Sequence, residues 1–160
     1  MNMNITRFGR TELHLACRNN DASAVRRLID ERVEEIDTKD AHGFSGLYHA
    51  AMFGHVECMA MLLNAGARIS STDLGGLSVL HIACEKGQLA AVRLLLERGA
   101  ELSTRDSIGR TPRDWAEVKG HSAILHALDE WEQYMHHQCR PTATETSSEI
   151  IDDQIAEILT

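Results

Sequence analysis

Aromatic side chains and proline are scarce in this chain of 160 residues. Phe, Trp and Tyr together make up 4% of the residues, whereas hydrophobic residues as a whole make up 43%, and only Pro112 and Pro141 are prolines. A core built mainly from Leu, Ala, Ile, Val and Met favours packed helices over an all-β sandwich. The sequence therefore predicts an all-α fold, and its length suits one domain or one compact repeat array.

The chain also lacks long apolar runs and a cysteine framework. No apolar run reaches the roughly 20 residues that span a bilayer, and the polar start at residues 1–4 lacks the pattern of a secretory signal. The four cysteines, Cys17, Cys58, Cys84 and Cys139, follow no spacing typical of a disulfide framework. We expect reduced thiols and a cytoplasmic and/or nuclear location.

Motifs for catalysis are few. The sequence has no Gly-rich phosphate loop, no paired carboxylates on an apolar cleft and no Ser/His/Asp arrangement. Two His-x-x-Cys pairs, His14 with Cys17 and His81 with Cys84, leave open a metal-binding or hydrolytic enzyme. A second, irregular group that could bind a metal ion consists of His121, His126, His136, His137 and Cys139. Because nothing supplies four convergent ligands or an oxyanion stabiliser, we expect no catalytic, cofactor or metal residues.

Negative charge is concentrated near the end of the sequence. The net charge is −8, but residues 1–129 hold 15 Lys and Arg against 17 Asp and Glu. Residues 130–160 hold seven acids against Arg140 alone. The tail is therefore acidic, and nucleic-acid binding is disfavoured because no known reading motif accompanies the charges.

A fixed period runs through most of the chain. Gly9, Gly43, Gly76 and Gly109 recur at an almost constant interval of roughly 33 residues, a length typical of helical repeat units. Ala16, Ala50, Ala83 and Ala116 each follow their glycine by seven positions, and a leucine follows each glycine by nineteen. Asp40 and Asp106 each begin a four-residue segment that ends in glycine, which is typical of a type I turn. The period thus predicts a turn followed by two short Leu/Ala-rich helices in each repeat.

The repeated segments resemble the ankyrin repeat family. The stretches that carry this resemblance are Thr11–Ala16, Ser45–Ala50, Ser78–Ala83 and Thr111–Ala116, which resemble the Thr-Pro-Leu-His-x-Ala pattern that the period of 33 accompanies. The resemblance implies an ankyrin-repeat solenoid of four helix-turn-helix units joined by β-turn hairpins. It also implies that His14 and His81 are structural residues, hydrogen-bonded to Thr11 and Ser78.

The domain boundaries follow from the same pattern. We expect an ankyrin repeat domain over residues 1–130, with repeats at about 6–39, 40–72, 73–105 and 106–130. Residues 131–140 are expected to extend the last helix, and residues 141–160 to form an acidic flexible tail with a short amphipathic helix. The end repeats depart from the pattern, since Arg32 replaces the usual glycine stop and Arg113-Asp114 replaces Leu-His. Trp115 is expected in the core. For Trp131, burial in the core and contact with a partner are equally expected.

The resemblance implies that a partner binds hairpin tips and the exposed face of the first helix in each repeat. With Arg7 and Glu85 included, the positions on these surfaces contain eight Lys or Arg and one acid, interspersed with apolar residues, which suits an acidic segment with apolar anchors. Phe44, Met52 and Phe53 are the expected hot spots. The predicted partner-binding residues are Arg10, Arg18, Lys39, His42, Phe44, Met52, Phe53, Leu74, Leu77, Lys86, Arg105, Ile108, Arg110 and Lys119.

We therefore expect a protein–protein interaction module acting as an adaptor, scaffold or stoichiometric inhibitor, and not an enzyme. A purely structural spacer is the other alternative, and nothing in the sequence identifies the partner. The acidic tail offers an occupant from within the chain, because Ile151, Ile155, Ile158 and Leu159 recur at helical spacing. Residues 149–159 are accordingly expected either to dock on the array or to serve as a second docking element.

Overall fold

The computed structural model describes residues 7–32 and 35–138, which contain eight helices. The described residues fall into two units, the first ending at Leu128 and the second covering residues 129–138. The predicted all-α repeat solenoid is confirmed: within the described ranges no strand forms, and Thr72 and Ser78 make an isolated bridge.

The helices come in four pairs, each preceded by a turn at one of the periodic glycines. The pairs are α1 (Glu12–Arg18) with α2 (Ala22–Asp30), α3 (Gly46–Phe53) with α4 (Val56–Asn64), α5 (Val79–Glu85) with α6 (Leu89–Glu97), and α7 (Pro112–Lys119) with α8 (Ser122–Gln138).

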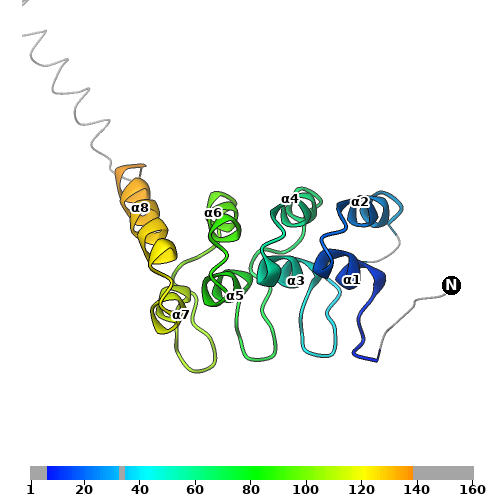
Figure 1. The fold of residues 1–160 in the computed structure, drawn as a ribbon, viewed down its shortest axis with the longest axis horizontal. Helices are drawn as coiled ribbons and strands as arrows, with labels where there is room; N and C mark the ends of the chain where they lie inside the picture. The colour runs from blue at the N-terminus through cyan, green and yellow to red at the C-terminus, as the bar shows by residue number, and fades with distance from the viewer. Residues whose placement is uncertain (1–6, 33–34, 139–160) are drawn as a thin grey trace, which may run out of the picture. The chain divides into compact units, whose positions relative to one another are not determined.

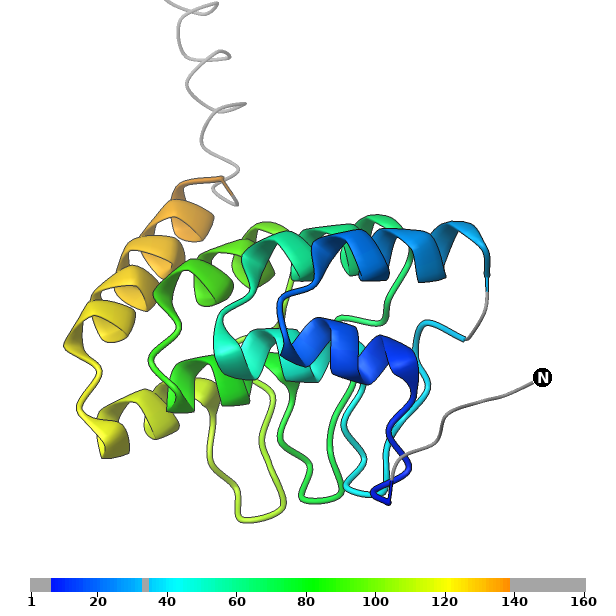
Figure 2. The same cartoon turned by 45° about the vertical axis from the view of Figure 1, so that its right-hand side comes forward.

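Two rows of helices build the first unit. The inner helices α1, α3, α5 and α7 pack one against the next, and the outer helices α2, α4 and α6 pack in a second row (Figure 1). The connecting hairpins lie side by side below the inner row (Figure 2). One repeat cannot bury its apolar face alone, so each repeat completes the core of its neighbour.

Small and large residues have separate places in the core. Ala50, Ala83 and Ala116 are fully buried in the inner helices, where their small side chains allow close packing. The outer helices contribute large side chains such as Leu62 and Leu95, which are also fully buried. Burial of a leucine side chain stabilises the fold by about 1.5–3 kcal/mol, so the repeated leucines dominate the apolar contribution.

Each inner helix begins at a hydroxyl residue. Thr11, Ser45, Ser78 and Thr111 are the N-cap residues, in extended backbone conformation. A side-chain oxygen at this position accepts from a free N–H of the first turn and stabilises the helix by about 1 kcal/mol. The Thr or Ser that begins each repeated Thr-Pro-Leu-His-x-Ala-like stretch therefore marks where an inner helix starts.

His14 and His81 connect their N-cap residue to the next repeat. The backbone N–H groups of Thr11 and Ser78 donate to Nδ1 of His14 (3.1 Å) and His81 (3.0 Å), so Nε2 carries the proton in each ring. His14 Nε2 donates to the carbonyl of Phe44 at 2.9 Å, and His81 Nε2 to that of Arg110 at 3.0 Å. The predicted structural role of these two histidines is confirmed.

The residues that immediately precede α4, α6 and α8 make a second set of bonds between repeats. His55 Nε2 donates to the carbonyl of Arg18 at 3.0 Å, and His121 Nε2 to that of Glu85 at 2.9 Å. Gln88 Nε2 donates to the carbonyl of Met52 at 3.3 Å in the middle of the array. Carbonyls at the ends of inner helices lack helical partners, and these side chains satisfy them.

The first repeat has no glycine after either of its helices, but its backbone keeps the positive φ that glycine adopts there in other repeats. Asn20 has φ +58° and Arg32 φ +48°, at the positions that Gly87 (φ +72°) and Gly99 (φ +87°) occupy in the third repeat. Asn tolerates the left-handed region, whereas Arg is strained there. The departure noted in the sequence at Arg32 is thus a change of side chain and not of conformation.

Candidate protein-binding surface

The hairpins present one edge of the array, which we call the hairpin edge and define as residues 7–10, 39–44, 72–77 and 105–110. Backbone bonds join the first hairpin to the second and the third to the fourth: Ala41 N–H donates to the carbonyl of Phe8, and Ser107 N–H to that of Gly75, both at 3.0 Å. Between the second and third hairpins the Lys39 side chain bonds the carbonyl of Thr72, so each tip is linked to a neighbour and the edge has one tip for each repeat.

Every aspartate on the hairpin edge is used inside its own turn. Asp40 Oδ1 accepts from the N–H groups of His42 (2.9 Å) and Phe44 (3.0 Å). Asp106 Oδ1 accepts in the same way from Ile108 (3.0 Å) and Arg110 (2.9 Å). Since Asp40 and Asp106 are 7% and 8% exposed, their charges face the turn and not the solvent.

The second oxygen of each aspartate is occupied by a side chain from an inner helix. His49 Nε2 donates to Asp40 Oδ2 at 2.9 Å, and Trp115 Nε1 donates to Asp106 Oδ2 at 2.8 Å. The hydroxyl of Tyr48 donates to Oδ2 of Asp73, in the following turn, at 2.9 Å. Asp73 is half-buried, and its Oδ1 accepts from the N–H groups of Gly75 (2.8 Å) and Leu77 (2.9 Å), so all three aspartates of the described hairpin edge are hydrogen-bonded within their turns.

These contacts shift the pKa values of the groups involved. Burial alone would raise the pKa of the Asp40 carboxyl, but hydrogen bonds from Phe44, His49 and His42 outweigh burial and lower it. Burial lowers the pKa of His49, whose Nδ1 has no hydrogen-bond partner, so the ring is neutral with its proton on Nε2. The Tyr48 pKa is raised, first by burial and then by its bond to Asp73.

Apolar side chains stand out from the tips of this edge. Leu74 is 82% exposed, Ile108 65% and Phe8 47%, and exposed His42 occupies the remaining tip. Exposed large apolar residues in a row are unusual on a monomer surface, whereas single ones are normal. The one-per-repeat arrangement makes the row a candidate recognition surface.

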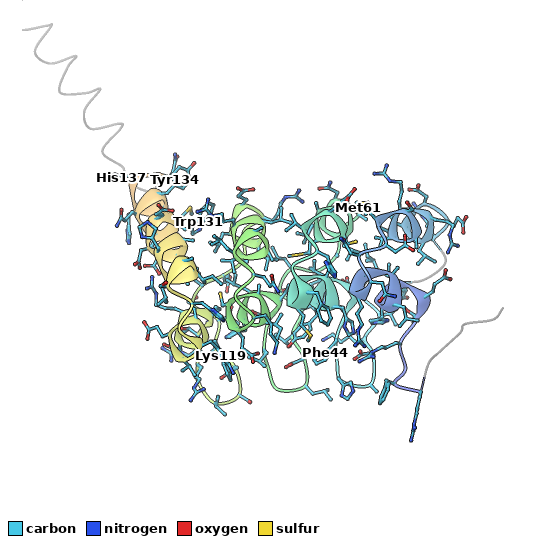
Figure 3. The ribbon with its side chains drawn as sticks, in the orientation of Figure 1. Phe44, Met61, Lys119, Trp131, Tyr134 and His137 are labelled. Carbon is cyan, nitrogen blue, oxygen red and sulfur yellow. The ribbon has the colours of Figure 1, made fainter. Side chains whose placement is uncertain are left out.

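Phe44 does not lie free on the surface as a hot spot would. Its ring stacks on that of Tyr48 with centroids 4.4 Å apart and an interplanar angle of 7°, and its edge meets His49 at 5.5 Å. The side chain is half-buried at the second hairpin, below α3 in Figure 3. Phe44 therefore contributes to the packing of the second repeat as well as to its surface.

Three cations of the edge, Lys39, Arg105 and Arg110, are held in position by neutral groups. Lys39 Nζ donates to the carbonyl of Thr72 at 2.6 Å, and Arg105 donates to the carbonyl of Gly109 at 2.9 Å. Arg110 lies over the ring of Trp115, 5.0 Å from its centroid. Carbonyls and rings orient these side chains without neutralising them, and Asp114, whose pKa Arg105 and Arg110 help to lower, offsets the two arginines only in part.

The carboxyl-terminal ends of the inner helices form a second row, comprising Arg18, Met52, Phe53, Lys86 and Lys119. Arg18 lies over the ring of Phe53 at 5.7 Å, and Phe53 is 42% exposed. Lys86 and Lys119 both lie within 3.7 Å of Glu85 Oε1. Because two lysines share one carboxylate, this row also keeps an excess of positive charge.

All of the predicted partner-binding residues lie in one of these two rows, and each keeps some solvent exposure. Nine are exposed: Arg18, Lys39, His42, Phe53, Leu74, Lys86, Arg105, Ile108 and Lys119. Five are half-buried: Arg10, Phe44, Met52, Leu77 and Arg110. Arg10 is the most constrained by charge, since its Nε lies 3.5 Å from Asp40 Oδ2. Whether a partner contacts these residues stays a prediction.

The sequence pattern did not predict that Trp115 would form a hydrogen bond with a hairpin aspartate. Trp115 was expected in the core but is half-buried, with its indole N–H bonded to Asp106. The signal was present in the alignment of repeats, because Trp115 and His49 both stand six positions after their periodic glycine and both carry a ring N–H. Val118, 60% exposed at the end of α7, and Phe8 add apolar surface beside the predicted residues.

In the described part of the chain, the two His-x-x-Cys pairs are buried and engaged in contacts within the fold. Cys17 and Cys84 are fully buried, and burial raises the pKa of the Cys84 thiol to about 12, which suppresses its nucleophilic thiolate form. His14 and His81 have both ring nitrogens engaged by Thr11, Ser78 and hairpin carbonyls. Within residues 7–32 and 35–138, no group of three His, Cys, Asp or Glu side chains is placed to hold a metal ion, and Cys139 lies outside these ranges.

The extension of the last helix carries an aromatic pair. α8 ends at Gln138, and within the second unit Trp131 and Tyr134 have ring centroids 5.6 Å apart (Figure 3). Trp131 is half-buried and Tyr134 is 52% exposed. None of the helices in the described part of the chain combines the length and hydrophobicity needed to cross a membrane. The expected tail helix at residues 149–159 lies outside the described residues.

Comparison with known proteins gives matches to repeat-containing proteins. One family model, "Ankyrin repeats (3 copies)", matches residues 1–73, and another, "Ankyrin repeats (many copies)", matches residues 62–116. The integrin-linked protein kinase homolog pat-4 of Caenorhabditis elegans is 42% identical over 55 residues, 34% of this chain and 12% of that protein. The tyrosine-protein kinase HTK16 of Hydra vulgaris is 35% identical over 63 residues, 38% of this chain and 8% of that protein.

The chain thus spans about a tenth of the length of these two relatives, and the similarity concerns a repeat segment. The period of 33, the hydroxyl N-caps, the bridging histidines and the stacked helix pairs all point to the same class as the two family models. Ankyrin repeats mediate binding to other proteins, and repeat domains of this kind are generally interaction modules without catalysis. The chain belongs to the ankyrin repeat family.

Proposed function

We propose that this chain acts as an adaptor, scaffold or stoichiometric inhibitor by binding an acidic segment with apolar anchors. The binding surface consists of the hairpin edge and the carboxyl-terminal ends of the inner helices. One observation carries the proposal: the hairpin edge displays apolar tips and cations while all three of its aspartates are used inside the turns.

Charge complementarity supports this choice of partner. Lys39, Arg105 and Arg110 are oriented by neutral groups, and the one carboxylate that interacts with both arginines is Asp114, so an acidic partner meets an excess of positive charge. Such charges raise association rates and select against basic partners more than they add affinity. Their fixed positions also reduce the side-chain entropy lost on binding.

Apolar anchoring supplies the remaining affinity. Phe53, Leu74 and Ile108 expose enough apolar surface for a partner to bury. Burying one such side chain contributes about 1.5–3 kcal/mol, or roughly tenfold to a hundredfold in affinity. Phe53 takes first place among the expected hot spots, because Phe44 is already stacked on Tyr48.

The test compares two triple variants in affinity capture of interacting proteins. Phe53→Ala, Arg18→Ala and Arg105→Ala remove exposed side chains of the proposed surface, while Arg26→Ala, Arg68→Ala and Glu97→Ala remove exposed side chains elsewhere on the array. The first variant is expected to lose a prey that the second retains, with both as thermally stable as the parent. Retention of the same prey by both variants would place binding elsewhere and contradict the proposal.

The tail extends the proposal to regulation. Residues 149–159 are acidic and carry an isoleucine stripe, so they match the chemistry expected of a partner. If they dock on the array, deletion of residues 141–160 raises the affinity for the captured partner at low salt, where charge attraction is least screened. Unchanged affinity at low salt would show that the tail does not compete.

A further inference from the structure

The row at the carboxyl-terminal ends of the inner helices changes its chemistry between the second and third repeats. Ten positions after the periodic glycines stand, in chain order, Asn19, Phe53, Lys86 and Lys119. Because α1, α3, α5 and α7 pack one against the next, these residues follow one another along the array in the same order (Figure 1). An aromatic ring thus precedes two cations, so the row has an apolar half around Phe53 and a basic half at Lys86 and Lys119.

The apolar half is built around an ordered ring that keeps solvent exposure. Arg18 lies 5.7 Å from the ring centroid of Phe53, and the His55 ring lies 6.0 Å from it at an angle of 22°. His55 is fixed in turn, because its Nε2 donates to the carbonyl of Arg18 at 3.0 Å. Phe53 is nevertheless 42% exposed. A side chain that is already ordered loses little entropy on binding, so Phe53 suits contact with an apolar side chain of a partner.

The basic half is built around one shared carboxylate. Lys86 Nζ lies 3.6 Å and Lys119 Nζ 3.7 Å from the same oxygen, Glu85 Oε1. The two lysine side chains are 44% and 46% exposed, whereas that of Glu85 is 16% exposed. Two cations from neighbouring repeats therefore converge at the surface over a carboxylate that cancels one of their two charges. Carboxylates of a partner can approach both ammonium groups from the solvent.

Glu117 is a further acid at the end of α7, and its position places it outside the basic half. It is exposed and stands eight positions after its periodic glycine, as Cys17 does in the first repeat. Cys17 faces the following repeat, because a Cβ added to Gly46 of α3 would lie 3.1 Å from Cys17 Sγ. Glu117 thus points along the array and not into the row, and the basic half keeps its excess of positive charge.

We infer that this row binds a two-part segment of another protein, in which an apolar side chain packs on Phe53 and a pair of carboxylates meets Lys86 and Lys119. Charge complementarity fixes which half of the row takes the acids, and aromatic surface fixes which half takes the apolar residue. The inference rests on the proposed function, since it assigns the apolar anchor and the acids of that partner to different repeats.

A labelled synthetic peptide with one Trp and two adjacent Glu residues is the probe, and its binding to the full chain is measured by fluorescence anisotropy. Packed helices lie about 8–10 Å apart and an extended chain spans about 3.3 Å per residue, so about four Gly or Ser residues separate the Trp from the glutamates. Both chain directions are synthesised, and the tighter binder is kept. A control of the same composition has the Trp between the two glutamates. The probe is expected to bind about tenfold more tightly than the control, and more weakly as salt is added.

Double-mutant cycles locate the two parts of the probe. Phe53→Ala should weaken the probe about tenfold but leave unchanged the affinity of a version with Ala in place of Trp. Lys86→Gln combined with Lys119→Gln should weaken the probe about fivefold but not a version with Gln in place of Glu. The charge-matched control, Arg26→Gln with Arg68→Gln, changes exposed residues outside the row and should alter binding less than twofold. Circular dichroism of each variant should match that of the parent.

The results of these measurements decide the inference on their own. Equal affinity of probe and control, no binding, or coupling of Phe53 to the glutamates instead of the Trp each overturns it. Binding that requires deletion of residues 141–160 overturns it too, because the tail would then be the occupant of the row.

The captured protein separates this inference from the proposed function. Its loss from both the Phe53, Arg18 and Arg105 triple variant and the lysine double variant supports the inference. If the triple variant loses it while the lysine double variant retains it, the proposed function stands and the inference fails. If both variants retain it, the proposed function fails as well.

Discussion

The first and third repeats use the same histidine network on differently secured backbones. His14 and His81 each accept from their N-cap residue and donate to a carbonyl of the next hairpin, with closely matching distances. Both helix stops of the third repeat are glycine, whereas the first repeat places Asn20 and Arg32 in the same left-handed backbone. The contacts between repeats are preserved at the end of the array, and the local backbone is less favourable there.

This difference fits the position of the two repeats. An internal repeat has neighbours on both sides, so a poor stop would weaken two interfaces. In the described residues the first repeat packs against one neighbour, and a repeat with one interface opens locally at lower cost, so strain in its loop is tolerated. The comparison teaches that the network defines the repeat, while the glycine stops adjust how firmly each repeat is held.

The largest effect is expected from removal of the network histidine. His81→Ala leaves the Ser78 N–H and the Arg110 carbonyl without their partner and opens a cavity, so it should lower the free energy of unfolding by about 3 kcal/mol. His14→Ala should cost about 2 kcal/mol or less, because the first repeat can open alone. Urea denaturation of both variants measures the difference. A larger loss at His14 would show that the terminal repeat is the firmer one.

Substitution of the two glycines that end the helices of the third repeat, Gly87 and Gly99, separates the cost of backbone strain from the cost of steric contact. Gly87→Ala adds a Cβ only 2.8 Å from Cε1 of the His121 ring as well as left-handed strain, so we expect a loss of about 2 kcal/mol. Gly99→Ala meets no atom within 4 Å and should cost about 1 kcal/mol from strain alone. Thermal denaturation of the pair provides the measurement. Equal losses would mean that the His121 ring moves aside at no cost.

Introducing glycine at the positive-φ positions of the first repeat should raise its stability. Arg32→Gly relieves the strain at φ +48° and should raise the free energy of unfolding by up to about 1 kcal/mol. Asn20→Gly should change it by a few tenths of a kcal/mol, because Asn already tolerates φ +58°. Hydrogen exchange of α1 and α2 amides reports whether the gain is local. Destabilisation by Arg32→Gly would show that the arginine side chain makes a contact worth more than the strain.

The sequence predicted the helices and hairpins because they depend on local patterns. Gly76 and Gly109 mark turns that begin with Asp73 and Asp106, and the hydroxyl N-caps mark helix starts, so the repeat could be recognised before any packing was known. The predicted partner-binding residues fall in two exposed rows for the same reason, since a periodic fold places equivalent positions on one edge.

The contacts within that surface could not be predicted, because they depend on three-dimensional distances. Phe44 looked like a free aromatic anchor, yet it stacks on Tyr48. Arg32 marked an altered stop, but its letter did not reveal that the left-handed backbone persists. The bond from Trp115 to Asp106 joins residues nine apart through a side chain that no other repeat has. Such substitutions preserve a contact with different chemistry, and a pattern of residue types does not detect them.

The smallest expected effect is on the pH dependence of stability, in which the second repeat should differ from the first and third. The position of His49 is occupied by Leu15 and Ile82 in those repeats, so only the second has a titratable group there. Burial lowers the pKa of His49 below its ordinary value of 6.5, so between the two values the unfolded chain binds a proton that the folded chain does not. The contribution of neutral His49 is therefore complete above pH 6.5 and is lost as the pH falls below it.

A glutamine at this position separates that titration from the hydrogen bond. His49→Gln keeps a donor for Asp40 Oδ2 but removes the proton uptake, so its urea midpoint should fall less than that of the parent between pH 7 and pH 5.5. Asp40 does not obscure the comparison, because its lowered pKa places its own loss of stability at more acidic pH. Parallel falls in the two proteins would mean that groups outside the second repeat cause the acid sensitivity, and that its buried imidazole is no more sensitive to pH than the leucine and isoleucine of its neighbours.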